Sequence, residues 1–204
     1  MSEDLLNITK IKNYISPKYY NYLENNKIII LDIIDSTNSY LLNRGIDNKT
    51  LICLAETQTN GRGRLDRTWF SPPNNIYLSL LWHFNYNINQ LSNLSIEVAV
   101  AINRILRKLG VIDSTIKWPN DILWHNRKLA GILIETRVNA NNNTCYAVIG
   151  VGLNVNLSKN LLLNANISIE QIVDLKEIMQ STPERNKLAG MLIEAILTTV
   201  LNYD

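Results

Sequence analysis

Apolar, β-branched runs alternate with polar segments along the chain, and their spacing predicts the secondary structure. Strands are expected where the runs are short and bounded by turn-forming residues, at 27–34, 51–55, 76–82, 115–118, 129–137 and 145–153, with a further short strand ending near Trp124. The asparagines at 141–143 predict a hairpin turn between the last two long strands, because Asn tolerates left-handed backbone conformations.

Helical spacing is clearest over residues 95–109, which we expect to form an amphipathic helix that ends at Gly110. Its predicted buried face consists of Val98, Ile102, Ile105 and Leu109. A short helix is expected at 39–43, after a segment whose hydroxyl groups can cap it, and Ser168 can cap another helix. Thr182-Pro183 predicts the start of a last helix, whose apolar face consists of Leu188, Met191, Leu192, Ala195 and Val200.

The order of these elements predicts the fold class. Strands grouped in the middle of the chain, with helices gathered near its end, favour one α+β domain with a mixed β-sheet and flanking helices. We expect this single domain to span residues 1–204, with its core at about 28–200. The segment ahead of the first strand is too short for a helix-turn-helix domain, so a DNA-binding role is not expected.

Composition narrows the function classes. The chain has 20 Lys and Arg against 18 Asp and Glu, and a formal charge of +2 is too small for a general nucleic-acid binder. No apolar run reaches the ~20 residues of a membrane span, so we expect a cytoplasmic protein without a membrane partner. Cys53 and Cys145 lie in apolar runs without CxxC spacing, which favours buried thiols in a reducing compartment. His83 and His125 are isolated and show no metal-ligand spacing.

The segment Gly61-Arg62-Gly63-Arg64 is the first candidate for chemistry. Glycines let a loop close over a ligand, and the planar fork of arginine suits a carboxylate or a phosphate. Taken alone, such a segment is more often a solvated surface turn, so it indicates a binding site only together with other residues.

Two further segments carry candidate residues. In Lys117-Trp118-Pro119-Asn120-Asp121, Pro119 holds the last two residues at a strand end, and the nearby Lys128 can direct its ammonium group along the sheet, where Gly131 leaves space. Glycines and asparagines also alternate over 150–156. An ordinary hairpin and a bulged strand edge are the alternatives for these segments. Neither a P-loop nor a G-x-S-x-G motif is present in the sequence. The remaining set of lysine, arginine, amide and tryptophan side chains favours a site that brings an organic carboxylate onto the α-phosphate of a nucleotide.

Six strings, in matching order and spacing, resemble the catalytic domain of the biotin protein ligases, the biotin–[acetyl-CoA-carboxylase] ligase family. They are DSTNSYLL (35–42), AETQTNGRGRLDRTWFSP (55–72), NIYLSLLW (75–82), KWPNDILW (117–124), RKLAGILIET (127–136) and VIGVGLNVN (148–156). The resemblance implies a mixed sheet related to class II aminoacyl-tRNA synthetases. It also implies an enzyme that joins biotin to ATP as biotinyl-5′-AMP, releases pyrophosphate, and transfers biotin to a lysine of the biotin carboxyl carrier protein of acetyl-CoA carboxylase. Mg²⁺ would accompany the ATP phosphates without an assigned protein ligand, and the family allows a homodimer.

By this resemblance, each candidate residue receives a role. The biotin-binding residues would be Ser36, Thr37, Asn38, Gln58, Arg62, Gly63, Arg64 and Lys128. Those around the adenylate would be Trp69, packed against adenine, with Lys117, Asn120 and Asn154. The catalytic residues would be Lys128, Arg64 and Asp121, the last of which orients the acceptor lysine or accepts its proton.

Two departures from the family pattern stand out. The family usually continues GRGR with one residue and then Gly, whereas this chain has Leu65-Asp66, which would change how the loop closes. The chain also ends at Asp204, where many relatives continue, so we expect the C-terminal SH3-like domain to be absent or truncated. The alternatives to a biotin ligase are a lipoate–protein ligase and a catalytically silent biotin-binding module.

Overall fold

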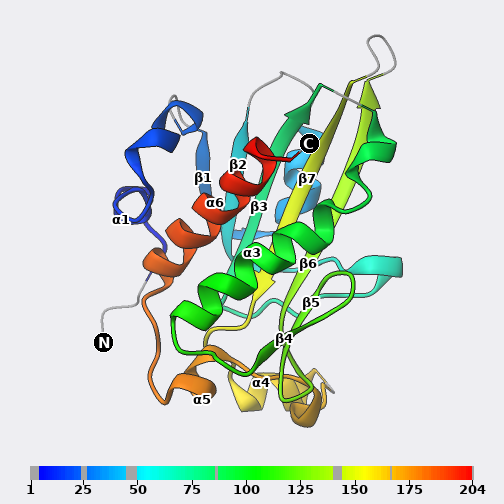
Figure 1. Ribbon diagram of the computed structural model, residues 1–204. Coiled ribbons are helices and arrows are strands. Elements are labelled where there is room, and N and C mark those ends of the chain that lie inside the picture. Colours follow the sequence, from blue (N-terminus) through cyan, green and yellow to red (C-terminus); the bar gives the residue numbers. More distant parts are fainter. Residues whose placement is uncertain are drawn as a thin grey trace.

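The sheet at the centre of the computed structural model is mixed. The structure describes residues 5–23, 27–44, 50–85, 87–139, 144–165 and 167–203, and within them seven strands lie in the order β1-β2-β3-β7-β6-β5-β4 (Figure 1). They are β1 (Ile28–Ile34), β2 (Leu51–Gln58), β3 (Ile76–Phe84), β4 (Ser114–Lys117), β5 (Asp121–Trp124), β6 (Arg127–Asn139) and β7 (Thr144–Leu153). The first two strands pair in parallel, and all the other neighbours pair antiparallel. The predicted turn at 141–143 lies outside the described residues.

Two long helices, α3 (Leu94–Lys108) and α6 (Arg185–Leu201), lie side by side across one face of this sheet (Figure 1). The short helix α2 (Thr37–Asn43) packs on the opposite face, against β2, β3 and β7. The remaining helices are α1 (Ile8–Lys12), α4 (Lys159–Asn164) and α5 (Leu175–Met179), with 3₁₀ turns η1 (Pro17–Tyr22), η2 (Arg64–Asp66), η3 (Ile88–Leu91) and η4 (Ile169–Gln171).

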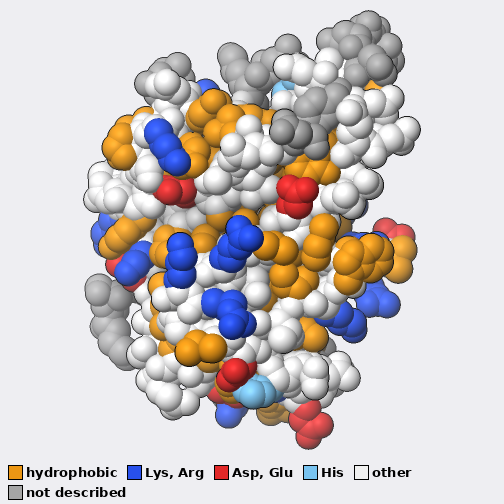
Figure 2. Space-filling model, in the orientation of Figure 1, with side chains coloured by type: hydrophobic (Ala, Val, Ile, Leu, Met, Phe, Trp, Pro, Cys, Tyr) orange, Lys and Arg blue, Asp and Glu red, His pale blue; other side chains and the backbone are white. Residues whose placement is uncertain are grey.

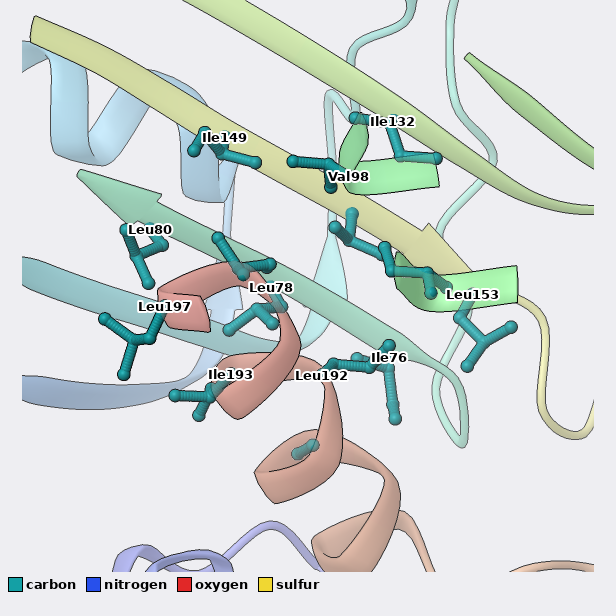
Figure 3. Close-up of a cluster of buried hydrophobic side chains, with 14 of the residues drawn as sticks. Ile76, Leu78, Leu80, Val98, Ile132, Ile149, Leu153, Leu192, Ile193 and Leu197 are labelled. Carbon is teal, nitrogen blue, oxygen red and sulfur yellow. The ribbon is translucent and has the colours of Figure 1, made fainter. Parts of the chain in front are cut away.

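Alternation along the strands divides the molecule into a packed side and a polar side. Leu78 and Leu80 of β3 and Ile149 of β7 point toward α3 and α6, where Val98 and Leu192 complete a buried apolar cluster (Figure 3). Successive side chains of a strand point to opposite faces. The residues that alternate with these three along β3 and β7 therefore project toward α2. That second face holds a small apolar cluster under α2 and, beside it, the candidate site.

A buried ion pair joins the last helix to this sheet. Nη1 of Arg185 lies 2.6 Å from Oε2 of Glu56 on β2, and both side chains are almost fully buried. The other carboxylate oxygen of Glu56 accepts the backbone N–H of Leu6, so the segment ahead of α1 is attached at the same point.

The predicted amphipathic helix is confirmed; its last residue is Lys108, and Gly110, with φ of +100°, terminates it two residues later. The N–H of Gly110 bonds the carbonyl of Arg107, and that of Val111 bonds the carbonyl of Leu106, which is a Schellman ending. The buried face is rotated from the predicted one: Leu106 is buried, while Ile105 and Leu109 are half-buried.

Other element boundaries differ from prediction. The helix expected at 39–43 begins at Thr37, because the hydroxyl of Ser36 caps it by accepting the N–H of Ser39 at 3.4 Å. Strand β2 continues three residues beyond its predicted end, to Gln58. The last helix begins at Arg185, two residues after Pro183. Asp174 caps α5, whereas Ser168 precedes η4.

Cys53 and Cys145 are buried free thiols, as predicted. None of the described helices is both long and apolar enough to cross a bilayer. On the face that carries α3 and α6, basic side chains are interspersed with apolar, uncharged and acidic ones (Figure 2).

Candidate active site

Glycines open the polar face of the sheet at its centre. Gly131 of β6 lies opposite Gly152 of β7, and Tyr77 and Asp121 extend this cross-strand row on either side. A Cβ atom on Gly152 would lie 2.5 Å from Cε2 of Trp69, and one on Gly131 would lie 2.9 Å from its Cζ3. Because glycine has no Cβ, the indole of Trp69 rests directly on the sheet.

A pocket lies beside this indole, between the sheet, α2 and the loop that contains the glycine–arginine segment. Of the residues predicted to bind or react with substrate, the following line it: Ser36, Thr37, Asn38, Gln58, Arg62, Gly63, Arg64, Trp69, Asn120, Asp121 and Lys128. Its free volume is about 60 Å³, well below the roughly 300–1,000 Å³ of typical small-molecule sites. A small-molecule ligand would therefore enlarge the pocket by displacing part of its lining.

Lys128 directs its ammonium group into this pocket. Its Nζ lies 2.8 Å from Oδ1 of Asp121 and 5.0 Å from the centre of a Trp69 ring. In the pairing of β5 with β6, Asp121 lies opposite Gly131 and Lys128 lies opposite Leu123. A bulge after Ile122 separates these two pairs. The side chain of Lys128 is 34% exposed, so the attraction between its ammonium and a nearby ligand anion would be only partly screened by water.

The arginine loop, defined as residues 61–67, forms a tight turn over the pocket. A Cβ on Gly61 would lie 2.3 Å from the carbonyl oxygen of Trp69, so this position requires glycine. Nη2 of Arg62 lies 2.9 Å from Oε1 of Glu135, and Nη1 of Arg64 donates to Oδ1 of Asn120 at 3.1 Å. The loop is thus attached at two points, to β6 through Glu135 and to the β4–β5 turn through Asn120.

Polar side chains form a connected network at the α2 end of the pocket. Oε1 of Gln58 accepts the backbone N–H and the hydroxyl of Thr37, while its Nε2 donates to Oγ of Ser71. Oγ of Ser79 lies 2.7 Å from Oγ1 of Thr37 and 2.6 Å from Oδ1 of Asn38. Such a network fixes donors and acceptors in place for a ligand with complementary polar groups.

Three of these residues, Ser71, Ser79 and Glu135, were not predicted from the sequence. Ser79 and Glu135 are polar residues within apolar strands, the first buried and the second half-buried, and a polar group removed from water needs a partner. A polar residue inside an apolar run was therefore the sequence signal that could have identified Ser79 and Glu135.

The structure does not bring two of the predicted residues to the pocket. Lys117 lies at the end of β4 with its side chain exposed, although its backbone pairs with Asp121. Asn154 is buried, and its Nδ2 donates to the carbonyls of Lys128 and Val173. It lines a second hollow, which shares Trp69 and Lys128 with the pocket and which Leu157 also lines.

Burial keeps two further titratable side chains of the sheet, Cys53 and Tyr77, in their neutral forms. Burial raises the pKa of Cys53 to about 12 and also raises the pKa of Tyr77, whose hydroxyl donates to the carbonyl of Pro72 at 2.6 Å. His125 lies in the β5–β6 turn, with Nε2 3.6 Å from Asp113. Among the described residues, no three His, Cys, Asp or Glu side chains gather as metal ligands.

Comparison with known proteins gives consistent matches. Residues 30–154 match the sequence model of the biotin/lipoate A/B protein ligase family. The chain is 36% identical over 176 residues to the bifunctional ligase/repressor BirA of Escherichia coli, covering 85% of this chain and 53% of that protein. It is 29% identical over 184 residues to the biotin–[acetyl-CoA-carboxylase] ligase of Mycobacterium tuberculosis, covering 85% and 65%. The chain thus spans about half the length of the first of these curated relatives.

Solved structures share the fold. Biotin protein ligase from Aquifex aeolicus in complex with biotin and ATP superposes with a TM-score of 0.68 at 25% identity, over 88% of this chain and 72% of that one. The Leishmania major enzyme in complex with biotinyl-5-AMP gives a TM-score of 0.67 at 22% identity, over 87% and 76%. The predicted mixed sheet with flanking helices, of the class II synthetase-like type, is confirmed.

Proposed function

The chain belongs to the biotin/lipoate A/B protein ligase family, and on this premise we propose that it activates biotin with ATP and passes the biotinyl group to a lysine of a carrier protein. The observation that carries the proposal is the position of Lys128. Its ammonium lies inside the pocket, between the polar network at one end and Trp69 at the other.

The first step requires two anions to meet. A carboxylate and a phosphate about 4 Å apart repel by about 4 kcal/mol at an effective dielectric near 20. Lys128 offsets this repulsion most directly, with Arg62 and Arg64 on the loop above. An oxygen of the biotin carboxylate attacks the α-phosphorus, the bond to the bridging oxygen breaks, and pyrophosphate leaves with the electron pair. The cations stabilise the charge on the α-phosphate as this occurs.

The polar network favours biotin over lipoate as the acid. A ureido ring offers two N–H donors and a carbonyl acceptor, which the hydroxyl of Thr37 and the amide groups of Asn38 and Gln58 can match, while the buried Ser79 holds Thr37 and Asn38 in place. The dithiolane ring of lipoate has no such groups, and buried polar side chains that lose their partners disfavour an analogue strongly.

Trp69 and the second hollow suit the adenine. The indole presents a flat apolar surface, and its Nε1 has no hydrogen-bond partner among the described residues. Apolar side chains of Leu157, Leu162 and Ile167 line the second hollow. Mg²⁺ would be held chiefly by the phosphates, because Asp121 is already paired with Lys128.

In the second step the acceptor lysine attacks the carbonyl carbon of the mixed anhydride, and AMP leaves. The lysine has an ordinary pKa near ~10.4 and must lose a proton first. Asp121 is proposed to orient the amine or accept that proton. The proposed carrier is the biotin carboxyl carrier protein of acetyl-CoA carboxylase, and the proposed location is the cytoplasm. A homodimer stays a prediction, which sedimentation would test.

The test is to incubate the chain with biotin, Mg·ATP and a purified carrier domain, and to follow the carrier by mass spectrometry. The proposal predicts one biotinyl group added to one lysine, with pyrophosphate released. Modification with lipoate instead would identify a lipoate ligase. Biotin binding without pyrophosphate release would identify a silent binding module, and either result would refute the proposal.

A further inference from the structure

Glu135 holds two parts of the pocket at once. It lies on β6 opposite Val148, on the pocket face of the sheet. Its Oε1 lies 2.9 Å from Nη2 of Arg62, and its Oε2 accepts a hydrogen bond from Nδ2 of Asn38 at 2.9 Å. One carboxylate therefore joins the arginine loop to helix α2.

The α2 side of this connection is rigid. Besides bonding Glu135, Asn38 donates to the carbonyl of Leu133, and its Oδ1 lies 2.6 Å from Oγ of Ser79. A Cβ on Gly150 would lie 2.2 Å from that oxygen, so the amide fills the space above the glycine. With both Nδ2 hydrogens engaged by acceptors, the orientation of the amide is fixed.

The loop side depends more heavily on Glu135. Arg62 stands between two glycines, and its other close side-chain contact is with Oγ of Ser39 at 3.5 Å. Fixing a long side chain on such a backbone has an entropy cost, which a ligand would otherwise meet when it binds. The ion pair fixes the Arg62 side chain before a ligand binds, so binding itself does not carry this entropy cost. A guanidinium with five N–H donors can bond Glu135 and still donate to a ligand oxygen.

Resting on the proposed function, we propose that Glu135 is a positioning residue for the reaction. It holds Arg62 over the pocket and orients the Asn38 amide, so that the loop retains the adenylate until the acceptor lysine arrives. Glu135 itself touches neither reacting group.

The test uses Glu135→Gln, which keeps the size of the side chain and an oxygen acceptor but removes the charge. With the purified chain, we expect biotinyl-AMP to dissociate about fivefold faster, as for the loss of one ion pair whose arginine is exposed, while first-turnover pyrophosphate release falls less than about twofold. Arg62→Gln, which also removes the guanidinium that faces the ligand, should accelerate dissociation more than Glu135→Gln does. Adding Glu135→Gln to Arg62→Gln should change little further, because both substitutions break the same pair. The matched control is Glu177→Gln, which breaks the Arg127–Glu177 ion pair outside the pocket.

A second readout does not depend on activity. Trypsin cleaves after arginine, and Arg64 and Arg67 are exposed on the loop. In the ligand-free chain, Glu135→Gln should raise the rate of cleavage within 61–67 about fivefold or more, with no change in Glu177→Gln. Unchanged cleavage and unchanged adenylate retention, or additive effects of the two substitutions, would overturn the inference. If the unaltered chain forms no adenylate, but Glu135→Gln is still cleaved faster than the unaltered chain, the proposed function is overturned. The positioning role of Glu135 is then still supported.

Discussion

Gly150 and Gly152 stand two residues apart on β7, and each leaves room for a different side chain of the site. Trp69 occupies the space above Gly152, and Asn38 occupies the space above Gly150. These contacts mark two ends of the pocket, and we propose that the Trp69 end receives the nucleotide and the Asn38 end receives biotin. The string that contains both glycines was recognised in the sequence, but the side chain above each one depends on the loop and on α2, which sequence spacing does not place.

Replacing each glycine by alanine should therefore weaken a different substrate. The new Cβ in Gly152→Ala would lie 2.5 Å from Trp69 and displace the indole, so we expect the KM for ATP to rise about tenfold with little change in biotin binding. Gly150→Ala, with its Cβ 2.2 Å from Asn38, should weaken biotin instead. Titration of each variant with each substrate measures this, and each variant controls for the other. Equal effects on both substrates would contradict the division.

Arg64 provides a second prediction at this scale. It donates to Asn120 from the exposed side of the loop, and we therefore propose that it contributes more to covering the adenylate than to forming it. Arg64→Gly should lower retention of biotinyl-AMP more than it lowers the rate of its synthesis. Filter retention after a single turnover measures the first and pyrophosphate release the second. A variant that held the adenylate as long as the unaltered chain would refute this role.

At the scale of elements, the turn η2 adopts an unusual backbone. It projects from the right-hand edge of the molecule in Figure 1, and Leu65 and Asp66 have φ of +54° and +57°. The expectation that a residue other than glycine at 66 would matter is consistent with this conformation, since left-handed backbone favours glycine. Asp tolerates it better than most residues, whereas Leu does not.

Leu65→Asn should stabilise the loop, because Asn adopts left-handed backbone readily and the replaced side chain is 83% exposed. We expect the free energy of unfolding to rise by up to about 1 kcal/mol. Leu65→Val should lower it, because a β-branched residue is strained there. Guanidinium denaturation of both variants checks the sign. Stabilisation by valine, or destabilisation by asparagine, would show that the turn is not held in this conformation.

Elements with one strong periodicity were predictable, and those decided by tertiary contacts were not. The helix at 95–109 was predicted within a residue at each end. The last residues of β2, Glu56 to Gln58, resemble a loop because they are polar. They are in a strand because Thr57 and Gln58 pair with β1 and Glu56 meets Arg185. Similarly, motif strings indicated most of the pocket lining, whereas Glu135 and Ser79 are significant only through partners distant in the sequence.

At the scale of the whole molecule, the ion pair between Arg185 and Glu56 connects the last helix, the sheet and the N-terminal segment. Removing one member leaves the other charge buried without its partner. Glu56→Gln should therefore lower the free energy of unfolding by about 3–5 kcal/mol. Chemical denaturation measures the loss, with Glu177→Gln, which breaks a more exposed pair, as the control. A loss no larger than that of the control would show that the buried pair does not hold these parts together.

The initial rate of pyrophosphate release from biotin and Mg·ATP, compared between the unaltered chain and Lys128→Met, tests the central claim most directly. We predict a fall of about a hundredfold or more with an unchanged melting temperature, because the ammonium that lets two anions meet is gone. Lys128→Met/Asp121→Asn, which removes the carboxylate left unpaired, should remain as slow. Release at the native rate in either variant would contradict the account.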